Sequence, residues 1–230
     1  MNNMKYNISV IMSVYNDEKN VETAIESILN QSYKNFEFLI IDDCSVDATF
    51  DKLENYKDLD SRVKIFKNST NIGLTKSLNL LLRNTSTELI ARQDSDDFSL
   101  PTRLEEQVNL IKDKKFDAVY TRAINKQTKT KIPGLSFYLP HKLSIKYKNP
   151  YIHGSLMIKH EVLKSLNYYS ENFYYAQDYK LAWDLHKRNY KVGVKNKALY
   201  VLNTKNNISE NFRNEQKHYA DCVRKELDPN

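Results

Sequence analysis

Four strand-like apolar runs, separated by amphipathic segments, most constrain the fold of this chain. The runs lie at 7–14, 36–41, 62–67 and 88–93, and apolar residues at helical spacing follow the first three. Parallel strands need long crossover connections, which are usually helices. The alternation therefore predicts an α/β fold with a mostly parallel central sheet flanked by helices.

Polar side chains suited to ligand binding follow three of these runs. They are Ser13 and Tyr15 after the first, Asp42 and Asp43 after the second, and the acids between Asp94 and Asp97 after the fourth. Right-handed crossovers bring the carboxyl ends of parallel strands to one edge of the sheet, where open α/β folds bind ligands. The pattern predicts a nucleotide site at that edge.

The acidic stretch after the fourth run carries the most specific chemistry. Asp94, Asp96 and Asp97 are three carboxylates within four residues. Like charges at this spacing repel one another unless a divalent cation or hydrogen-bond donors lie between them. Two interpretations follow: a metal site, or a solvated acidic turn before a helix that begins near Pro101.

The second half of the chain is less regular. Helices are expected at 101–112, 160–166, 176–186 and 208–227, and strands at 116–122 and 190–202. The chain has no internal repeat and no linker rich in Pro or Gly. One domain over 1–230 is therefore expected, with a nucleotide-binding half at 1–97 and an acceptor-binding half at 98–230.

The net charge of +6 is unevenly distributed. Residues 1–97 carry 16 acids and 11 Lys/Arg, whereas residues 98–230 carry 13 acids and 24 Lys/Arg. The segment 112–148 alone has ten Lys/Arg and two acids. Such a surface is typical of contact with nucleic acid or an anionic membrane; the simpler alternative is a solvated face in a lysine-rich chain.

The remaining features predict a cytoplasmic protein. The two cysteines, Cys44 and Cys222, are far apart in sequence and form no disulfide framework, which favours a reducing compartment. The first residues show no signal-peptide pattern, and no apolar stretch approaches the roughly 18 residues that would cross a bilayer.

Five segments, taken together, resemble the family 2 glycosyltransferases, which are inverting nucleotide-sugar enzymes of the GT-A fold. The segments are 10–16, 37–45, 71–73, 91–97 and 177–178. Their order and spacing make the set specific, and bacterial enzymes of lipopolysaccharide, O-antigen and capsule synthesis are the most similar. The resemblance implies metal-dependent transfer of a sugar, with UDP-sugars favoured as donors, to a hydroxyl of a glycan acceptor.

The resemblance also implies roles for residues of the first half. Ser13, Tyr15 and Asp43 match positions of the nucleoside pocket, with Tyr15 as a platform for the base and Asp43 as acceptor for a base N–H. Lys76 and Arg92 match positions that could meet the diphosphate, although an Arg at this place is as often a structural partner of the acids.

The Asp-x-Asp motif of the family matches Asp94 and Asp96. Asp94 is expected near the ribose and Asp96 on the metal, with Asp97 sharing that work. Carboxylate oxygens are the ligands that Mn²⁺ or Mg²⁺ prefers, and the cation would neutralise charge on the leaving diphosphate. Asn203 stands where many relatives carry His, which leaves the third protein ligand of the metal open.

The general base of the family matches Asp178, which is preceded here by Gln177 where relatives usually have Glu. The alternative for Asp178 is an acid favoured by the macrodipole in the first turn of a helix. His153 resembles a residue beside the donor sugar and the acceptor, and Gln177 is grouped with it. A lone His is also common as a hydrogen-bonded core residue.

Three other functions are weighed against glycosyl transfer. A nucleotidyltransferase should have a Gly-rich loop after its first strand, and none of the four glycines lies there. A basic nucleic-acid-binding module would use the lysines but leaves the acids unexplained. An inactive relative of the GT-A fold is the third alternative. The preferred partners are a nucleotide sugar and a glycan acceptor, including a lipid-linked one at the inner face of the membrane.

Overall fold

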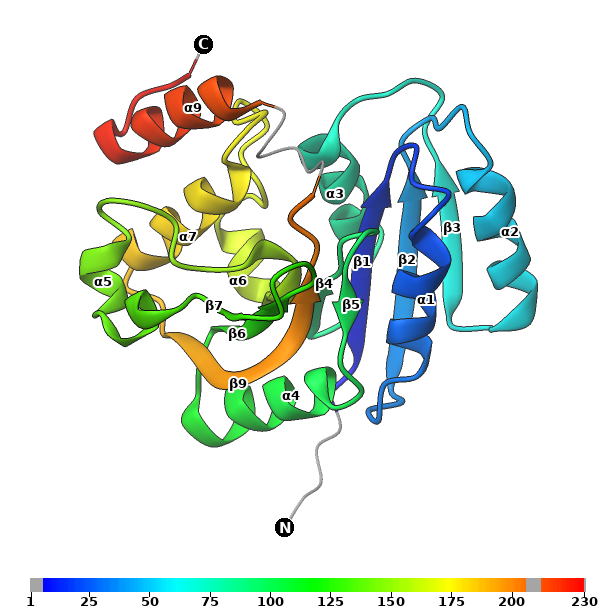
Figure 1. Cartoon of the computed structure of the whole chain (residues 1–230), viewed down its shortest axis with the longest axis horizontal. Helices are drawn as coiled ribbons and strands as arrows, with labels where there is room; N and C mark the ends of the chain where they lie inside the picture. The colour runs from blue at the N-terminus through cyan, green and yellow to red at the C-terminus, as the bar shows by residue number, and fades with distance from the viewer. Residues whose placement is uncertain (1–5, 206–211, 230) are drawn as a thin grey trace.

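The computed structural model describes residues 6–205 and 212–229, and in this part of the chain it has one nine-stranded sheet (Figure 1). The strand order is β3-β2-β1-β4-β8-β6-β9-β5, and β7 pairs with β6. Helices cover both faces of the sheet. The predicted α/β fold class is therefore confirmed.

The first half folds as its apolar pattern predicts. The strands β1 (Ile8–Val14), β2 (Phe36–Asp42), β3 (Val63–Lys67) and β4 (Leu89–Arg92) pair in parallel, with β1 between β2 and β4. The crossovers contain α1 (Val21–Leu29), α2 (Thr49–Leu59) and α3 (Leu74–Arg83). All four strands therefore end at the same edge of the sheet.

The second half extends this sheet in the other direction. The strand β8 (Met157–Lys159) is antiparallel to β4, and β6 (Ala118–Asn125) is antiparallel to β8. The long strand β9 (Val192–Leu202) is parallel to β6, so it ends at the same edge as β4. Two short strands complete the sheet: β5 (Phe98–Ser99), antiparallel to β9, and β7 (Lys131–Ile132), antiparallel to β6.

The remaining helical elements surround this second half. They are α4 (Arg103–Lys114), α5 (His141–Ser144), α6 (His160–Ser165), α7 (Gln177–Lys187), α9 (Arg213–Lys225) and the 3-10 turns η1 (Leu135–Tyr138) and η2 (His153–Ser155). Residues 208–211 of the expected terminal helix lie outside the described residues.

Two apolar cores lie on opposite faces of the sheet. Along β1, Val10 and Met12 pack in the core formed with α1, α2 and α4, whereas Ile11 packs in the core formed with α3, α6, α7 and α9. Side chains of a strand alternate between faces, and here both faces are buried. This explains why the strands of the first half appear in sequence as nearly continuous apolar runs.

Within 6–205 and 212–229, no helix combines the length and the apolar character needed to cross a membrane.

Candidate functional site

Acidic side chains from two loops converge beyond the ends of β1 and β4. The hydroxyl of Ser95 donates a hydrogen bond to Oδ2 of Asp17 (2.7 Å), which ties the two loops together. The pKa of Asp96 is raised to about 6, first by burial and then by the negative charges of Asp94 and Asp17. Burial, Asp94 and Asp96 also raise the pKa of Asp97 well above its usual range. The expected repulsion among these acids is therefore present.

The structure adds Asp17 to the cluster of Asp94, Asp96 and Asp97 that the sequence predicted. It follows the first strand-like run by three residues and lies at the predicted edge of the sheet. Its position after a strand end was a usable signal. Its proximity to Asp96, however, depends on the conformation of two loops far apart in the chain.

The donor set fits a divalent cation that binds together with a substrate. Oδ2 of Asp97 is buried without a hydrogen-bond partner, so one oxygen of the cluster lacks a compensating contact. In the described part of the chain, no group of three His, Cys, Asp or Glu side chains could hold a metal ion on its own. Mg²⁺ in phosphate sites typically uses one or two carboxylates and takes its other ligands from phosphate and water. Asp96, with Asp94 and Asp97 beside it, can supply those one or two carboxylates.

Asn203 lies directly against the two acids of the predicted metal site. Its backbone N–H donates to Oδ1 of Asp97 (2.6 Å), and its side-chain Nδ2 donates to Oδ2 of Asp96 (3.1 Å). The antiparallel pairing of Phe98 with Val201 brings the end of β9 to this place. Asn203 thus contacts both acids and supplies hydrogen-bond donors to them.

Arg92 is enclosed by protein and holds Asp94. Its guanidinium donates to Oδ1 of Asp94 (2.5 Å) and to the carbonyl oxygens of Ile11 and Gln93. The side chain is 1% exposed. This geometry agrees with the structural alternative for Arg92, a partner of the acids, and not with direct contact to a diphosphate.

A second buried arginine, Arg103, and a tyrosine, Tyr200, also hold the backbone around Asp94 and Gly154. The sequence analysis did not single out either residue. The guanidinium of Arg103 lies over the Tyr200 ring, 5.5 Å from its centroid, and donates to the carbonyl oxygen of Gly154 (3.3 Å). The Tyr200 hydroxyl accepts a hydrogen bond from the backbone N–H of Asp94 (3.2 Å). A Cβ at Gly154 would lie 2.2 Å from the Tyr200 hydroxyl oxygen, so this close approach requires glycine.

The candidate nucleoside residues lie at the edge formed by β1 and β2. Tyr15 is 50% exposed just after β1, and Ser13 is partly exposed within it. Asp43 is buried, and its carboxylate accepts hydrogen bonds from Nδ2 of Asn68 (2.7 Å) and from the backbone N–H groups of Ile72 (3.0 Å) and Gly73 (2.8 Å). Asp43 therefore anchors the loop that follows β3.

Lys76 is exposed in the first turn of α3, directly after this loop. Its charge contributes to lowering the pKa of Glu171, after the larger effects of Asn79 and Arg83. Lys76 is thus accessible to an anion, and its acidic neighbour lies on the loop before α7.

The candidate general base, Asp178, lies in the first turn of α7 and accepts a hydrogen bond from Nδ2 of Asn149 (2.7 Å). Gln177, the first residue of that helix, is buried. The sequence analysis did not single out Asn149, and no local pattern marks it, because the contact joins the loop before η2 to the start of α7.

His153 is partly buried between the acid cluster and the start of α7, and its Nε2 is hydrogen-bonded to the Tyr169 hydroxyl (2.8 Å). Its pKa is lowered to about 4, first by burial and then by the charge of Arg92, whereas the charges of Asp94 and Asp178 oppose this shift. The ring is therefore neutral at pH 7, and it lies within electrostatic range of both carboxylates.

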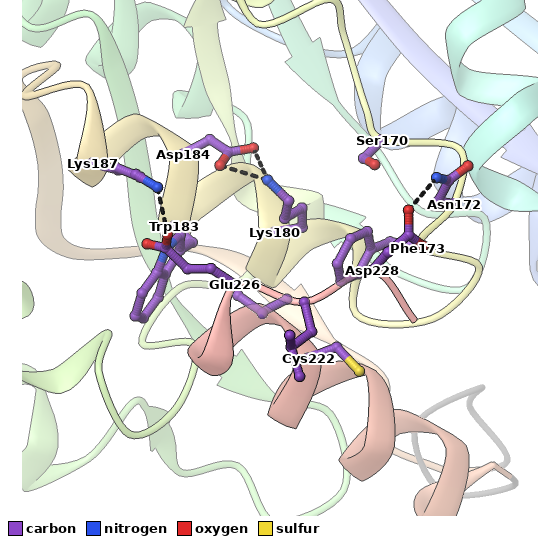
Figure 2. A pocket seen from close by; sticks show the side chains of 12 residues that line it. Ser170, Asn172, Phe173, Lys180, Trp183, Asp184, Lys187, Cys222, Glu226 and Asp228 are labelled. Carbon is purple, nitrogen blue, oxygen red and sulfur yellow. Dashed lines mark hydrogen bonds and ion pairs between the residues drawn. The ribbon is translucent and has the colours of Figure 1, made fainter. Parts of the chain in front are cut away.

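A separate hollow of about 320 Å³ lies between α7 and α9 (Figure 2). Its two lysines are paired with acids, Lys180 with Asp184 and Lys187 with Glu226. None of the residues predicted for the nucleotide or the metal lines it. This hollow is therefore separate from the residues predicted at the sheet edge.

Comparisons with known proteins agree with this geometry. A profile of Glycosyl transferase family 2 matches residues 9–167. The chain is 34% identical over 165 residues to the putative glycosyltransferase EpsE of Bacillus subtilis, covering 70% of this chain and 59% of EpsE. It is 38% identical over 182 residues to the O-antigen biosynthesis glycosyltransferase WbnJ of Escherichia coli, covering 76% of this chain and 69% of WbnJ.

A solved structure shows the same fold. Residues 1–349 of S. aureus TarS, in complex with UDP, superpose with a TM-score of 0.74 at 22% identity, covering 94% of this chain and 65% of that one. The chain thus spans between about 59% and 69% of the length of these three proteins.

Proposed function

The chain belongs to glycosyl transferase family 2, and from this premise we propose that it transfers a sugar from a nucleotide-sugar donor to a hydroxyl group of a glycan acceptor, with inversion. The observation that carries the proposal is the cluster of acids beyond the ends of β1 and β4, in which Arg92 holds Asp94 and Asn203 holds Asp96 and Asp97. A nucleic-acid-binding module would not need this arrangement.

UDP-sugars are the preferred donors in this proposal. The superposed TarS structure holds UDP, and the sheet edge of this chain offers a partly exposed Ser13 and an exposed Tyr15 beside the end of β1. An exposed aromatic ring suits a base, because stacking tolerates every base. Asp43 contributes by holding the adjacent loop with three hydrogen bonds, and its carboxylate has capacity for about one more.

A divalent cation, Mn²⁺ or Mg²⁺, would be held by Asp96, with Asp94 and Asp97 beside it. When bound, the cation neutralises the charge that develops on the leaving nucleoside diphosphate. Hydrogen bonds hold these carboxylates in position: Arg92 donates to Asp94, and Asn203 donates to Asp96 and Asp97. Burial, and after it the negative charges of neighbouring acids, raise the pKa values of Asp96 and Asp97, and a bound cation would offset the repulsion among these charges.

Asp178 is the proposed general base. As the acceptor oxygen forms a bond to the anomeric carbon, the bond from that carbon to the diphosphate oxygen breaks, and Asp178 receives the proton of the acceptor hydroxyl. A single displacement of this kind inverts the configuration at the anomeric carbon. Asn149 leaves one carboxylate oxygen of Asp178 for this task, because its hydrogen bond goes to Oδ2.

The acceptor in this proposal is a growing surface polysaccharide, which the name of WbnJ as an O-antigen biosynthesis enzyme supports. The basic second half of the chain favours an anionic form of it, such as a lipid-linked diphosphate glycan at the inner face of the membrane. The proposal therefore includes peripheral association with that membrane.

Calorimetry with UDP tests the metal-dependent part of this function. Wild-type protein should bind UDP with Mn²⁺ present and lose most of that affinity in EDTA, because the diphosphate then faces the acid cluster without a cation. Asp96→Ala should cause the same loss even with Mn²⁺ present. The matched control is Asp113→Ala, which removes an exposed acid of α4 and should leave affinity unchanged. Equal affinity in EDTA would refute metal dependence, and failure to bind any nucleoside diphosphate would refute the proposed function.

A further inference from the structure

An exposed apolar segment lies between β7 and η2. We call residues 135–148 the docking segment; it contains η1 and α5. Five of its large apolar side chains face solvent: Leu135 is 88% exposed, Tyr138 69%, Leu139 57%, Leu143 56% and Tyr147 78%. Single exposed apolar residues are ordinary on protein surfaces, but five within one short segment indicate an interaction surface.

Positive charge is interleaved with these apolar side chains. Lys142, Lys146 and Lys148 are exposed within the same segment. The sequence has no Asp or Glu from Ala118 to His160, so no acid of this stretch neutralises the lysines. Residues 112–134 are also basic, but among their described side chains no large apolar one is exposed. Within residues 112–148, the two properties coincide only in the docking segment.

The docking segment lies at one end of the molecule. In Figure 1, α5 lies at the end of the molecule opposite α2. A hollow of about 620 Å³ is lined by Phe137, Leu139 and His141 from the segment and by Tyr190 and Val192 from the body. Ser144 and Ile145 are buried, so these two residues anchor the segment to the body while its exposed side chains face outward.

The docking segment leads directly to the candidate catalytic site. Its last residue precedes Asn149, whose side chain donates to Asp178. The Tyr179 hydroxyl, one residue beyond Asp178, donates to the carbonyl oxygen of Ile145 within the segment. Any partner bound by the segment thus lies near the proposed general base.

We propose that the docking segment binds the surface of an anionic bilayer. Its leucines and tyrosines enter the head-group region, and its lysines contact lipid phosphates, which is the arrangement expected of an interfacial element. The inference rests on the proposed function for its purpose: a lipid-linked acceptor held at that surface would present its hydroxyl near Asp178.

Charge distinguishes the bilayer from other occupants. A second copy of the chain docked through the same segment by two-fold symmetry would place lysines against lysines. The phosphates of a nucleic acid could pair with the lysines, but phosphate binding does not explain why leucines are exposed beside them. An anionic bilayer satisfies both the charged and the apolar side chains.

Flotation with vesicles of phosphatidylethanolamine and phosphatidylglycerol tests this inference. Wild-type protein should float at low salt, less at high salt, and weakly with neutral phosphatidylcholine. Lys142→Gln/Lys146→Gln should lower the partition coefficient about 25-fold, because each lysine near an anionic surface contributes about fivefold. Leu139→Ser/Leu143→Ser should lower it by roughly tenfold or more, because apolar area is no longer buried.

Matched pairs at the opposite end of the molecule serve as controls. Lys34→Gln/Lys57→Gln removes two exposed lysines, and Val46→Ser/Leu59→Ser removes two exposed apolar side chains. Both control pairs should float like the wild type. Calorimetry with UDP on the same samples separates the two proposals, because flotation requires no nucleotide.

Three results would overturn the inference. The first is no flotation of the wild type at low salt, and the second is equal losses in the control pairs. The third is a wild type that does not bind vesicles but binds another partner through this segment. In that case either the Lys142→Gln/Lys146→Gln variant loses binding of a duplex oligonucleotide, or the Leu139→Ser/Leu143→Ser variant dissociates a dimer. That result would assign the segment to nucleic acid or to a second copy.

Discussion

At the scale of single residues, a hydrogen bond from Asn149 holds the side chain of Asp178, the proposed general base. Asp178 contacts neither the acid cluster nor the loop held by Asp43 through any hydrogen bond of the described structure. Its role in the reaction can therefore be separated from donor binding. The alternative role, stabilising the start of α7 through the helix dipole, remains a competing explanation that experiment can distinguish.

We predict that Asp178→Asn abolishes most transfer while UDP binding stays unchanged. The amide keeps the shape of the carboxylate but cannot accept the acceptor proton, and general-base catalysis typically contributes about 10²–10⁴-fold. A purely structural role predicts instead a loss of about 0.3–1 kcal/mol in stability with nearly normal transfer. Transfer rate, UDP affinity and melting temperature measured on this one variant decide between the two roles.

Removal of Asn149 should affect catalysis through Asp178, while its second hydrogen bond, accepted from the backbone N–H of Tyr151 (3.1 Å), affects only its own loop. Asn149→Ala should lower kcat by up to about 10²-fold, because the carboxylate is no longer held in its productive orientation. In the Asp178→Asn background the same change should cost little more, since residues that act as a unit are not additive. A full additional loss in the double variant would show that Asn149 has a separate role.

At the scale of elements, the loop between β3 and α3 depends on one buried carboxylate and one glycine. Asp43, just after β2, accepts hydrogen bonds from two successive backbone N–H groups of this loop, those of Ile72 and Gly73. Gly73 has a φ of +86°, a conformation that favours glycine. A Cβ there would also lie 2.7 Å from the Tyr174 ring.

Gly73→Ala should therefore destabilise the protein. The left-handed backbone conformation costs a residue with a Cβ about 1–2 kcal/mol, and the contact with Tyr174 adds to this. Urea unfolding measures the change. Asn71→Ala, at an exposed position of the same loop, is the control and should change stability by less than about 0.5 kcal/mol. Equal stability of the two variants would contradict the strain argument.

At the scale of the whole molecule, one sheet joins the two halves of the chain. The strand β4 of the first half pairs with β8 of the second, and the core under α3, α6, α7 and α9 draws side chains from both halves. From this shared core we predict that the described residues unfold as one cooperative unit. The core also joins the proposed donor and acceptor sides of the site.

We predict a single unfolding transition for both halves. Trp183, the one tryptophan of the chain, lies in α7 and reports on the second half, whereas Leu81 lies in α3 of the first. Leu81→Ala should lower stability by roughly 2–5 kcal/mol. The Trp183 fluorescence and far-UV circular dichroism transitions should then shift together. A fluorescence transition that stays at its wild-type midpoint would show that the halves unfold separately.

Local patterns in the sequence determined the fold class and the chemical character of the site. Apolar runs of strand length alternate with helical spacing, and buried parallel strands require such runs on both faces. The acids at Asp43 and Asp94–Asp97 follow strands directly, so the common edge of parallel strands was enough to expect them near one another. The family could be identified for the same reason, because its motifs lie at these strand ends.

Only the tertiary structure decided which side chains support that chemistry. Ser95 on Asp17, Asn149 on Asp178 and Asn203 on Asp96 are contacts between segments distant in the sequence, so no spacing encodes them. The direction of β9 brings Asn203 to the acids, and this direction depends on the whole order of the sheet. Burial also indicates the partner of Arg92. A guanidinium can pair with either a diphosphate or a carboxylate, and the enclosed side chain of Arg92 pairs with Asp94.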